Sequence, residues 1–438
     1  MIWIPQTANA SKLPDLFPDR IEVPVPALLD ANSFYDHLRR DTEVYTAGCA
    51  GHSLLFESWL QQAPASAAGV RFTGVHIPTV NRFDFASLHS TTRQRTIFLS
   101  TELRDSWSAG RIDYLPMSYS ATWQWLSQQA EFDVALVQVA PPDANGQCSL
   151  GVACDFTPAA WPRSTRILAH VNPRMPRTQG PSIPWSRIHA AIEHDGPLLE
   201  APDPAPDPVM ELVAARIATL VPDRATLQLG LGRLQSAVLR ALRGRRDLRL
   251  HTGMVSDGLL GLIADDALAS APDAVVAGVA LGSQALYDAV AGRVQFRDVG
   301  HTHDHGVLRA IPRLTAINSA LSVDLLGQIN GDFLGGRQIS GIGGLPDFLR
   351  GARQAPQGRG IIALPSVTPK GQTRIVPVLS AGPVSVARID ADCIVTEHGI
   401  ADLRYMDVHA RARALIAIAD PSHRESLERD WHEIAQRL

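Results

Sequence analysis

Glycine clusters in three loops could present backbone N–H groups to a bound anion. They contain Gly230 and Gly232; Gly341, Gly343 and Gly344; and Gly48 and Gly51. A glycine turn between a strand and a helix can bind an anion or stabilise a developing oxyanion. Tight packing is the commoner role of such a turn, and neither cluster in the second half has dinucleotide or P-loop spacing. Taken singly, each cluster is therefore weak evidence for an anion or oxyanion site, and none identifies a ligand.

Histidines are concentrated between Gly300 and Gly306, in the run Gly-His-Thr-His-Asp-His-Gly. On an extended chain His301, His303 and His305 would share one face, as metal ligands do. The run resembles the His-x-His-x-Asp-His motif of metallo-β-lactamases, but one residue is missing before the aspartate. We therefore expect no metal centre here, but one histidine in a cleft and two at the surface.

Acidic residues follow two further strand-like segments. Asp257 comes after the segment at 248–250, and its expected role is to cap the helix that follows. Glu397 comes directly after the segment at 393–396, at the end of a strand where α/β proteins bind ligands. The alternative is that Glu397 caps the next turn while Asp402 and Arg404 face solvent. Glycine clusters, a cleft and several acids would suit acyl or phosphoryl transfer.

The elements that must position these residues alternate between strands and helices. Apolar segments predict strands at 43–47, 96–100, 134–139, 166–171, 226–229, 274–279, 314–318, 360–364 and 393–396. Helical patterns lie between them, for example at 53–61, 210–220, 234–242 and 408–419. Many of the strands are apolar on consecutive residues, as buried parallel strands are. The alternation predicts an α/β fold with mainly parallel sheets.

A proline-rich segment from Gly196 to Pro208 divides the chain, because its five prolines cannot continue a helix or a central strand. We expect an N-terminal α/β domain at 1–195, this linker at 196–208, and a C-terminal α/β domain at 209–438. Clefts between such domains are favoured ligand sites, so the active site is expected between them.

The composition excludes several classes of function. The 438 residues carry 40 Lys and Arg against 44 Asp and Glu, so no basic excess is present for nucleic acid. No apolar run reaches the roughly 20 residues that a transmembrane helix needs. The N-terminal residues lack the basic stretch and apolar run that are typical of a secretory signal, and four cysteines do not make a disulfide framework. A cytoplasmic location is expected.

Motifs along nearly the whole chain resemble those of the acetyl-CoA hydrolase/transferase family, which includes acetate-, succinyl- and 4-hydroxybutyrate-type CoA-transferases. Residues 133–151, DVALVQVAPPDANGQCSLG, are similar to the family's DVALIQVSPPDxxGxxSLG. The other matching segments follow in the family's order at 172–180, 227–239, 316–328, 340–348 and 395–404. The resemblance implies two open α/β domains with the active site between them.

The resemblance also implies covalent catalysis. In this family a glutamate attacks the acyl-CoA thioester and forms an acyl-glutamyl anhydride, then a glutamyl-CoA thioester. Backbone amides of the loops at 230–232 and 341–344 would stabilise the oxyanions, with Asp347 in the same loop, and Glu397 would lie close to the reacting centre. The partners implied are an acyl-CoA and a small carboxylic acid, with coenzyme A as a substrate moiety and no other cofactor. A homodimer is expected from the resemblance alone.

The chain departs from the family pattern at two positions. The family's catalytic glutamate lies in H-T-E-M-x-S-D-G, whereas this chain reads His-Thr-Gly253-Met-Val-Ser-Asp-Gly. In the family's Y-T-N-D-P segment the asparagine is replaced by His303. Because glycine has no side chain, the anhydride route is closed at Gly253.

Three hypotheses follow from these departures. In the first, loss of the glutamate leaves room for a water, and His303 or Glu397 acts as its general base in hydrolysis of the thioester. In the second, another carboxylate, foremost Glu397, takes over the nucleophile's role in a CoA-transferase. In the third, the protein binds a CoA-like ligand without catalysis.

Overall fold

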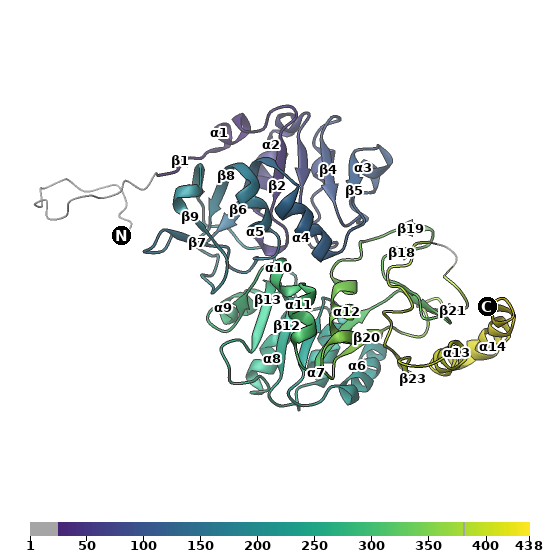
Figure 1. Cartoon of the computed structure of the whole chain (residues 1–438). Helices are drawn as coiled ribbons and strands as arrows, with labels where there is room; N and C mark the ends of the chain where they lie inside the picture. Colours follow the sequence, from purple (N-terminus) through teal and green to yellow (C-terminus); the bar gives the residue numbers. More distant parts are fainter. Residues whose placement is uncertain (1–24, 380–381) are drawn as a thin grey trace, which may run out of the picture.

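The N-terminal half forms one eight-stranded sheet (Figure 1). The structure is a computed structural model, and it describes residues 25–379 and 382–438. Every pairing in this sheet is parallel. Its strands, in sheet order, are β1 (Ala27–Leu28), β10 (Ala190–Glu193), β8 (Ser164–Val171), β6 (Phe132–Val139), β2 (Glu43–Thr46), β3 (Arg71–Thr73), β4 (Arg93–Thr96) and β5 (Ile112–Tyr114). The helices of this half are α1 (Ala31–Asp36), α2 (Leu54–Gln62), α3 (Arg104–Ser108), α4 (Tyr119–Gln128) and α5 (Thr157–Ala160). An antiparallel pair, β7 (Gln147–Ser149) and β9 (Ser182–Pro184), lies beside it.

The C-terminal half forms a second eight-stranded sheet, parallel except for its last hairpin. Its strands, in sheet order, are β14 (Gln295–Phe296), β13 (Val275–Ala280), β12 (Arg249–Val255), β11 (Thr226–Leu229), β15 (Leu314–Ser319), β20 (Arg359–Ala363), β22 (Cys393–Thr396) and β23 (Gly399–Asp402). The helices are α6 (Pro208–Leu220), α7 (Arg233–Ala241), α8 (Gly258–Ala264), α9 (Gln284–Val290), α10 (Val299–Thr302), α11 (His305–Ala310), α12 (Leu345–Gln354), α13 (Val408–Ala417) and α14 (Pro421–Ala435). Short pairings join β16 (Ser322–Asp324) to β17 (Ile329–Asn330) and β21 (Ile375–Val376), and β18 (Phe333–Leu334) to β19 (Arg337–Gln338).

The predicted fold class, two α/β units with mainly parallel sheets, is confirmed. Two local expectations are wrong. The strand expected at 96–100 ends at Thr96, and the residues after it leave the sheet so that the Leu99 amide donates to the Ser340 carbonyl at 3.2 Å. Asp257 stands at the start of α8 but does not cap it, because its carboxylate accepts from the amide and hydroxyl of Ser283 at 2.9 and 2.7 Å.

The proline-rich segment lies along both halves of the molecule. The Asn172 side chain donates to the Gly196 carbonyl at 2.9 Å, and the Tyr287 hydroxyl donates to the Leu199 carbonyl at 2.6 Å. Helix α6 begins at Pro208, the last of the five prolines, where a missing N–H costs nothing. The domain limits at 195 and 209 stay a prediction.

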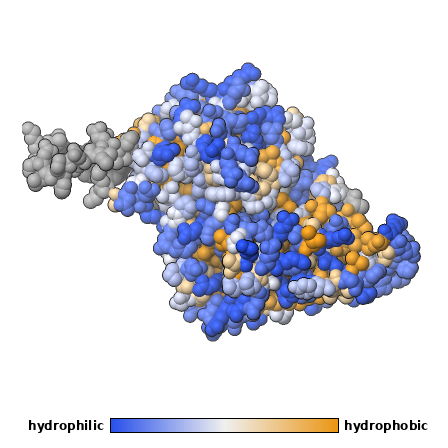
Figure 2. Space-filling model, viewed as in Figure 1, coloured by the Kyte–Doolittle hydropathy of each residue, from blue (hydrophilic) through white to orange (hydrophobic). Residues whose placement is uncertain are grey.

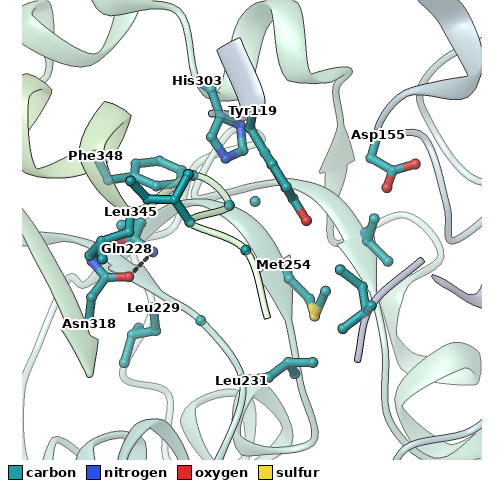
Figure 3. Close-up of a pocket in the computed structure, with 18 of the residues that line it drawn as sticks. Tyr119, Asp155, Gln228, Leu229, Leu231, Met254, His303, Asn318, Leu345 and Phe348 are labelled. Carbon is teal, nitrogen blue, oxygen red and sulfur yellow. Dashed lines mark hydrogen bonds between the residues drawn. The ribbon is translucent and has the colours of Figure 1, made fainter. Parts of the chain in front are cut away.

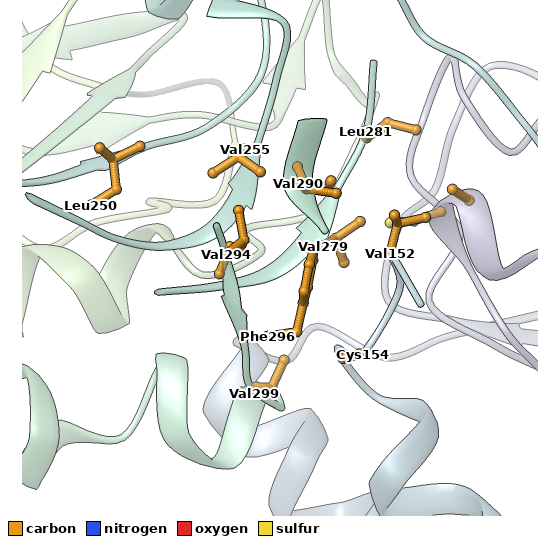
Figure 4. Close-up of a cluster of buried hydrophobic side chains, with 14 of the residues drawn as sticks. Val152, Cys154, Leu250, Val255, Val279, Leu281, Val290, Val294, Phe296 and Val299 are labelled. Carbon is orange, nitrogen blue, oxygen red and sulfur yellow. The ribbon is translucent and has the colours of Figure 1, made fainter. Parts of the chain in front are cut away.

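A hydrophobic core crosses from one half to the other (Figure 4). Val152 and Cys154 of the N-terminal half are buried in the same cluster as Val279, Phe296 and Val299 of the C-terminal half. Hydrogen bonds fix this contact, since the Ala280 amide donates to the Val152 carbonyl at 2.8 Å. Burial of shared apolar surface therefore holds the two sheets in one relative position.

The surface in Figure 2 is largely polar, and its hydrophobic side chains gather over the C-terminal half, toward the side that carries β21. Exposed hydrophobic residues in this part of the chain include Val378, Val384 and Ile389. Across residues 25–379 and 382–438, no helix is both long enough and apolar enough to span a bilayer.

Candidate active site

A cavity of about 290 Å³ lies between the two halves (Figure 3). Loops that follow parallel strands line it, since β11, β12 and β15 of the C-terminal sheet end here. The N-terminal half adds Cys49, Ile77, Phe98, Tyr119 and Asp155. The residues from the C-terminal half include Gln228, Gly230, Gln235, Gly253, Met254, His303, Asn318, Gly341, Gly343, Gly344 and Phe348.

Two of the three predicted glycine loops meet in this cavity through Gly230 and the segment 341–344. A Cβ at residue 341 would lie 2.0 Å from the carbonyl oxygen of Ile97, so only glycine fits there. Within the described residues, the backbone amides of Gly230, Gly341, Gly343 and Gly344 donate to no other group. Such amides, held beside a cavity, can stabilise an oxyanion.

The third glycine cluster reaches the cavity through Cys49, which has φ +49 and is buried. The Asn81 side chain holds this turn, because its Oδ1 accepts from the Cys49 amide at 2.9 Å. Burial raises the pKa of the Cys49 thiol well above its usual value, so the thiol stays protonated.

Gly253 and His303 lie against each other. Gly253 is in β12, and a Cβ there would lie 3.0 Å from Cε1 and 3.3 Å from Nε2 of His303. A Cβ at Gly344 would lie only 2.3 Å from the same Nε2. The imidazole therefore fills the space directly beside both glycines, and any water must lie farther into the cavity.

His303 is a weak base in this position. It is buried between Phe348 and Tyr119, with ring centroids 4.4 and 5.0 Å away, and its Nδ1 is 2.9 Å from the Thr302 hydroxyl. Burial, with a smaller effect from His251, lowers its pKa to about 3. The imidazole is neutral at pH 7 and gains a proton only at a large cost.

The histidine run is helical, so the extended arrangement in which its three side chains would share a face is not formed. It spans α10 and the start of α11, with His303 between them. His301 packs on His251 at 5.6 Å, and among these three histidines only His303 lines the cavity. In the part of the chain that the structure describes, no three His, Cys, Asp or Glu residues are grouped to hold a metal ion.

Glu397 is not brought to Gly253. Both of its carboxylate oxygens accept from the Ser366 amide, at 3.1 and 2.9 Å, and Oε1 also accepts from the Ser366 hydroxyl at 2.6 Å. Strands β11, β15 and β20 separate β22, which precedes Glu397, from β12. With strands about 4.8 Å apart, four spacings put β22 roughly 19 Å from β12.

Two further predicted residues lie outside the cavity lining. Asp347 is buried in the first turn of α12, where it accepts from the amide and hydroxyl of Ser120 at 3.0 and 2.6 Å. It therefore ties the C-terminal half to α4. Gly232 starts α7, and its carbonyl accepts from the Ser236 amide and hydroxyl at 3.1 Å.

Sequence reasoning missed Asp155, Tyr119 and the Gln228–Asn318 pair. The pair bridges the ends of β11 and β15, with Asn318 Nδ2 donating to Gln228 Oε1 at 2.8 Å (Figure 3). Tyr119 directs its hydroxyl into the cavity. The one available signal for Asp155 was its position directly after the apolar residues 150–154.

Two parallel α/β halves enclosing a cavity lined by backbone amides define an enzyme with its active site between domains. The N-terminal domain of the acetyl-CoA hydrolase/transferase family matches residues 28–199, and its C-terminal domain matches residues 282–431. The chain belongs to this family of enzymes.

Both CoA-transferases and acetyl-CoA hydrolases are similar to the chain. A 4-hydroxybutyrate coenzyme A transferase of Clostridium kluyveri is 38% identical over 350 residues, which cover 77% of this chain and 82% of the relative. An acetyl-CoA hydrolase of Eremothecium gossypii is 31% identical over 201 residues, covering 43% and 37%. The crystal structure of RipA from Yersinia pestis has a TM-score of 0.85 at 27% identity, covering 93% of this chain and all of that one.

Proposed function

We propose that this protein hydrolyses the thioester of a small acyl-CoA, with water as the acyl acceptor. The observation that carries the proposal is Gly253, which lines the cavity and has the His303 imidazole beside its backbone. A glycine at the family's nucleophile position cannot form the glutamyl anhydride on which acyl transfer depends. Relatives named as acetyl-CoA hydrolases make hydrolysis a chemistry that this family includes.

The glycine loops have a defined role in this reaction. Attack on the thioester carbonyl gives a tetrahedral oxyanion, and the amides of Gly230 and of residues 341–344 are its donors. Coenzyme A is the leaving group and not a resident cofactor. A cavity of about 290 Å³ suits a short acyl chain together with the thioester.

The test is incubation of the purified full chain with acetyl-, propionyl-, butyryl- and succinyl-CoA, with and without acetate. Free thiol is followed together with the transfer of CoA to acetate. We expect net thiol release that does not require acetate. A Gly341→Ala variant, purified identically, shows whether thiol release comes from this cavity. Its methyl group would displace the loop from Ile97, so thiol release is expected to fall.

Two outcomes would contradict the proposal. Exchange of CoA between acids without net hydrolysis would make the protein a CoA-transferase. No turnover, combined with a higher melting temperature in the presence of CoA, would make it a binding protein. The homodimer and the cytoplasmic location stay predictions from the sequence.

A further inference from the structure

Asp155 lines the cavity from a loop of the N-terminal half that packs against β13, the strand next to the one that carries Gly253. The residues that lead to it are bound to β13, since the Cys154 amide donates to the Gly278 carbonyl at 2.9 Å. A Cβ at Gly278 would be 3.8 Å from the Asp155 Cβ and 2.9 Å from the Gly253 carbonyl oxygen. The Asp155 carbonyl also accepts from the Val299 amide at 3.0 Å. These contacts fix Asp155 in the same cavity as Gly253, on the side of the strand β13 that adjoins it.

The surroundings of Asp155 bury its carboxyl group and raise its pKa. Of the described residues that line the cavity, Asp155 is the one carboxylic acid, and it is 5% exposed. The Cys49 thiol donates to Oδ2 over 3.9 Å, which leaves Oδ1 available to another donor. Burial raises the pKa of Asp155 to about 6, against the smaller lowering effects of backbone amides and Cys49. A base with a pKa near the working pH is suited to removing a proton from water.

We propose that Asp155 is the general base that activates water for thioester hydrolysis in this cavity, an inference that rests on the function proposed above. The Asp155 carboxylate takes one proton from water while the water oxygen bonds to the thioester carbonyl carbon. The tetrahedral intermediate then breaks its C–S bond, and the CoA sulfur takes the proton back from Asp155. The products are the free acid and CoA thiol, and Asp155 returns as the carboxylate.

The other candidate groups in the cavity fit the role less well. His303 is a weak base at its low pKa and is enclosed by aromatic rings. Cys49 is held as a thiol by burial and serves as a donor to Asp155. Tyr119 also has its pKa raised by burial, so its hydroxyl is a donor that can hold the water or the carbonyl.

The test compares wild type with Asp155→Asn, and with Asp288→Asn on the exposed face of α9 as the matched control. We expect kcat to fall about 10²-fold or more in Asp155→Asn, the size of a lost general base, and to hold in Asp288→Asn. Wild-type kcat/KM is expected to fall below about pH 6, and this acidic limb is expected to be absent from any residual Asp155→Asn activity. A fully active Asp155→Asn with an unchanged limb overturns the inference.

A measurement on the wild type keeps the test decisive if Asp155→Asn does not fold. Radiolabelled free CoA is added during hydrolysis, and its entry into the remaining acyl-CoA is measured. Direct attack by water gives no such exchange, which supports the general base. Exchange together with net thiol release means that an acyl-enzyme forms, which overturns the general-base role but keeps the hydrolase. No thiol release from any acyl-CoA instead refutes the proposed function itself.

Discussion

The packing of His303 on Gly253 makes the substitution Gly253→Glu a direct test of how the site differs from its family. The new Cβ would lie 3.0 Å from Cε1 of His303, whereas carbon atoms in contact are about 3.5 to 4.0 Å apart. His303 has little room to move, because Phe348, Tyr119 and Gly344 pack against it. Overpacking of this kind costs about 1–3 kcal/mol of unfolding free energy.

Urea denaturation of four proteins measures the effect: wild type, Gly253→Glu, His303→Asn and the double variant. Because asparagine is shorter than histidine, the second substitution gives the glutamate space. We expect the double variant to be more stable than the sum of the single losses predicts, by about 0.5–3 kcal/mol. The matched control is Gly261→Glu in α8, where no atom lies within 4 Å of the Cβ, and it should not destabilise.

The same four proteins are also assayed for CoA exchange between acids. The double variant has the residues that the family resemblance implies at positions 253 and 303, so it is the one expected to gain CoA exchange between acids. Single losses that add within about 0.5 kcal/mol would refute the reasoning, because residues in contact couple and independent ones do not. A stable Gly253→Glu would refute it as well.

Three more predictions concern carboxyl groups. Burial raises the pKa of Asp155 from 3.8 to about 6 in the folded protein. Ionisation of this group therefore opposes folding by up to about 3 kcal/mol above pH 6, whereas below pH 4 it has no such effect. Asp155→Asn should therefore gain stability relative to wild type as pH rises from 4 to 8, measured by urea denaturation. Ser120→Ala removes the hydroxyl that donates a hydrogen bond to the Asp347 carboxylate. It should lower the unfolding free energy by about 1–3 kcal/mol in the same assay. Glu397→Gln weakens the bonds to Ser366 and should lower the melting temperature without the loss of thiol release expected for Asp155→Asn.

Individual strands were predictable because buried parallel strands are apolar on consecutive residues. The segments at 226–229 and 393–396 are β11 and β22 to the residue. The same signal misled at 96–100, where the apolar residues after Thr96 pack beneath the loop of Gly341 and not in the sheet. Apolar character reports burial, and burial does not distinguish a strand from a loop between domains.

The order of strands within a sheet was not predictable, and it decides which residues meet. Glu397 and Gly253 both lie at or beyond the C-terminal part of a strand, yet three strands stand between β22 and β12. Asp155 belongs to the other half of the chain, and contacts between the two halves, among them the pairing of residues 153 and 279, bring it to the same cavity. Contacts between residues so far apart in the sequence depend on the whole fold, so the spacing of residues along the chain could not reveal them.

The position of Asp155 also bears on the choice between transfer and hydrolysis. A CoA-transferase must admit a second carboxylate, the acceptor acid, to the cavity that Asp155 lines. Two carboxylates close together in a site shielded from water repel each other, and one of them must take up a proton. Water brings no charge into the cavity and can donate a hydrogen bond to Asp155. Glycine at position 253 and an ionisable carboxyl in the same cavity therefore support our proposal that water, and not an acid, is the acyl acceptor.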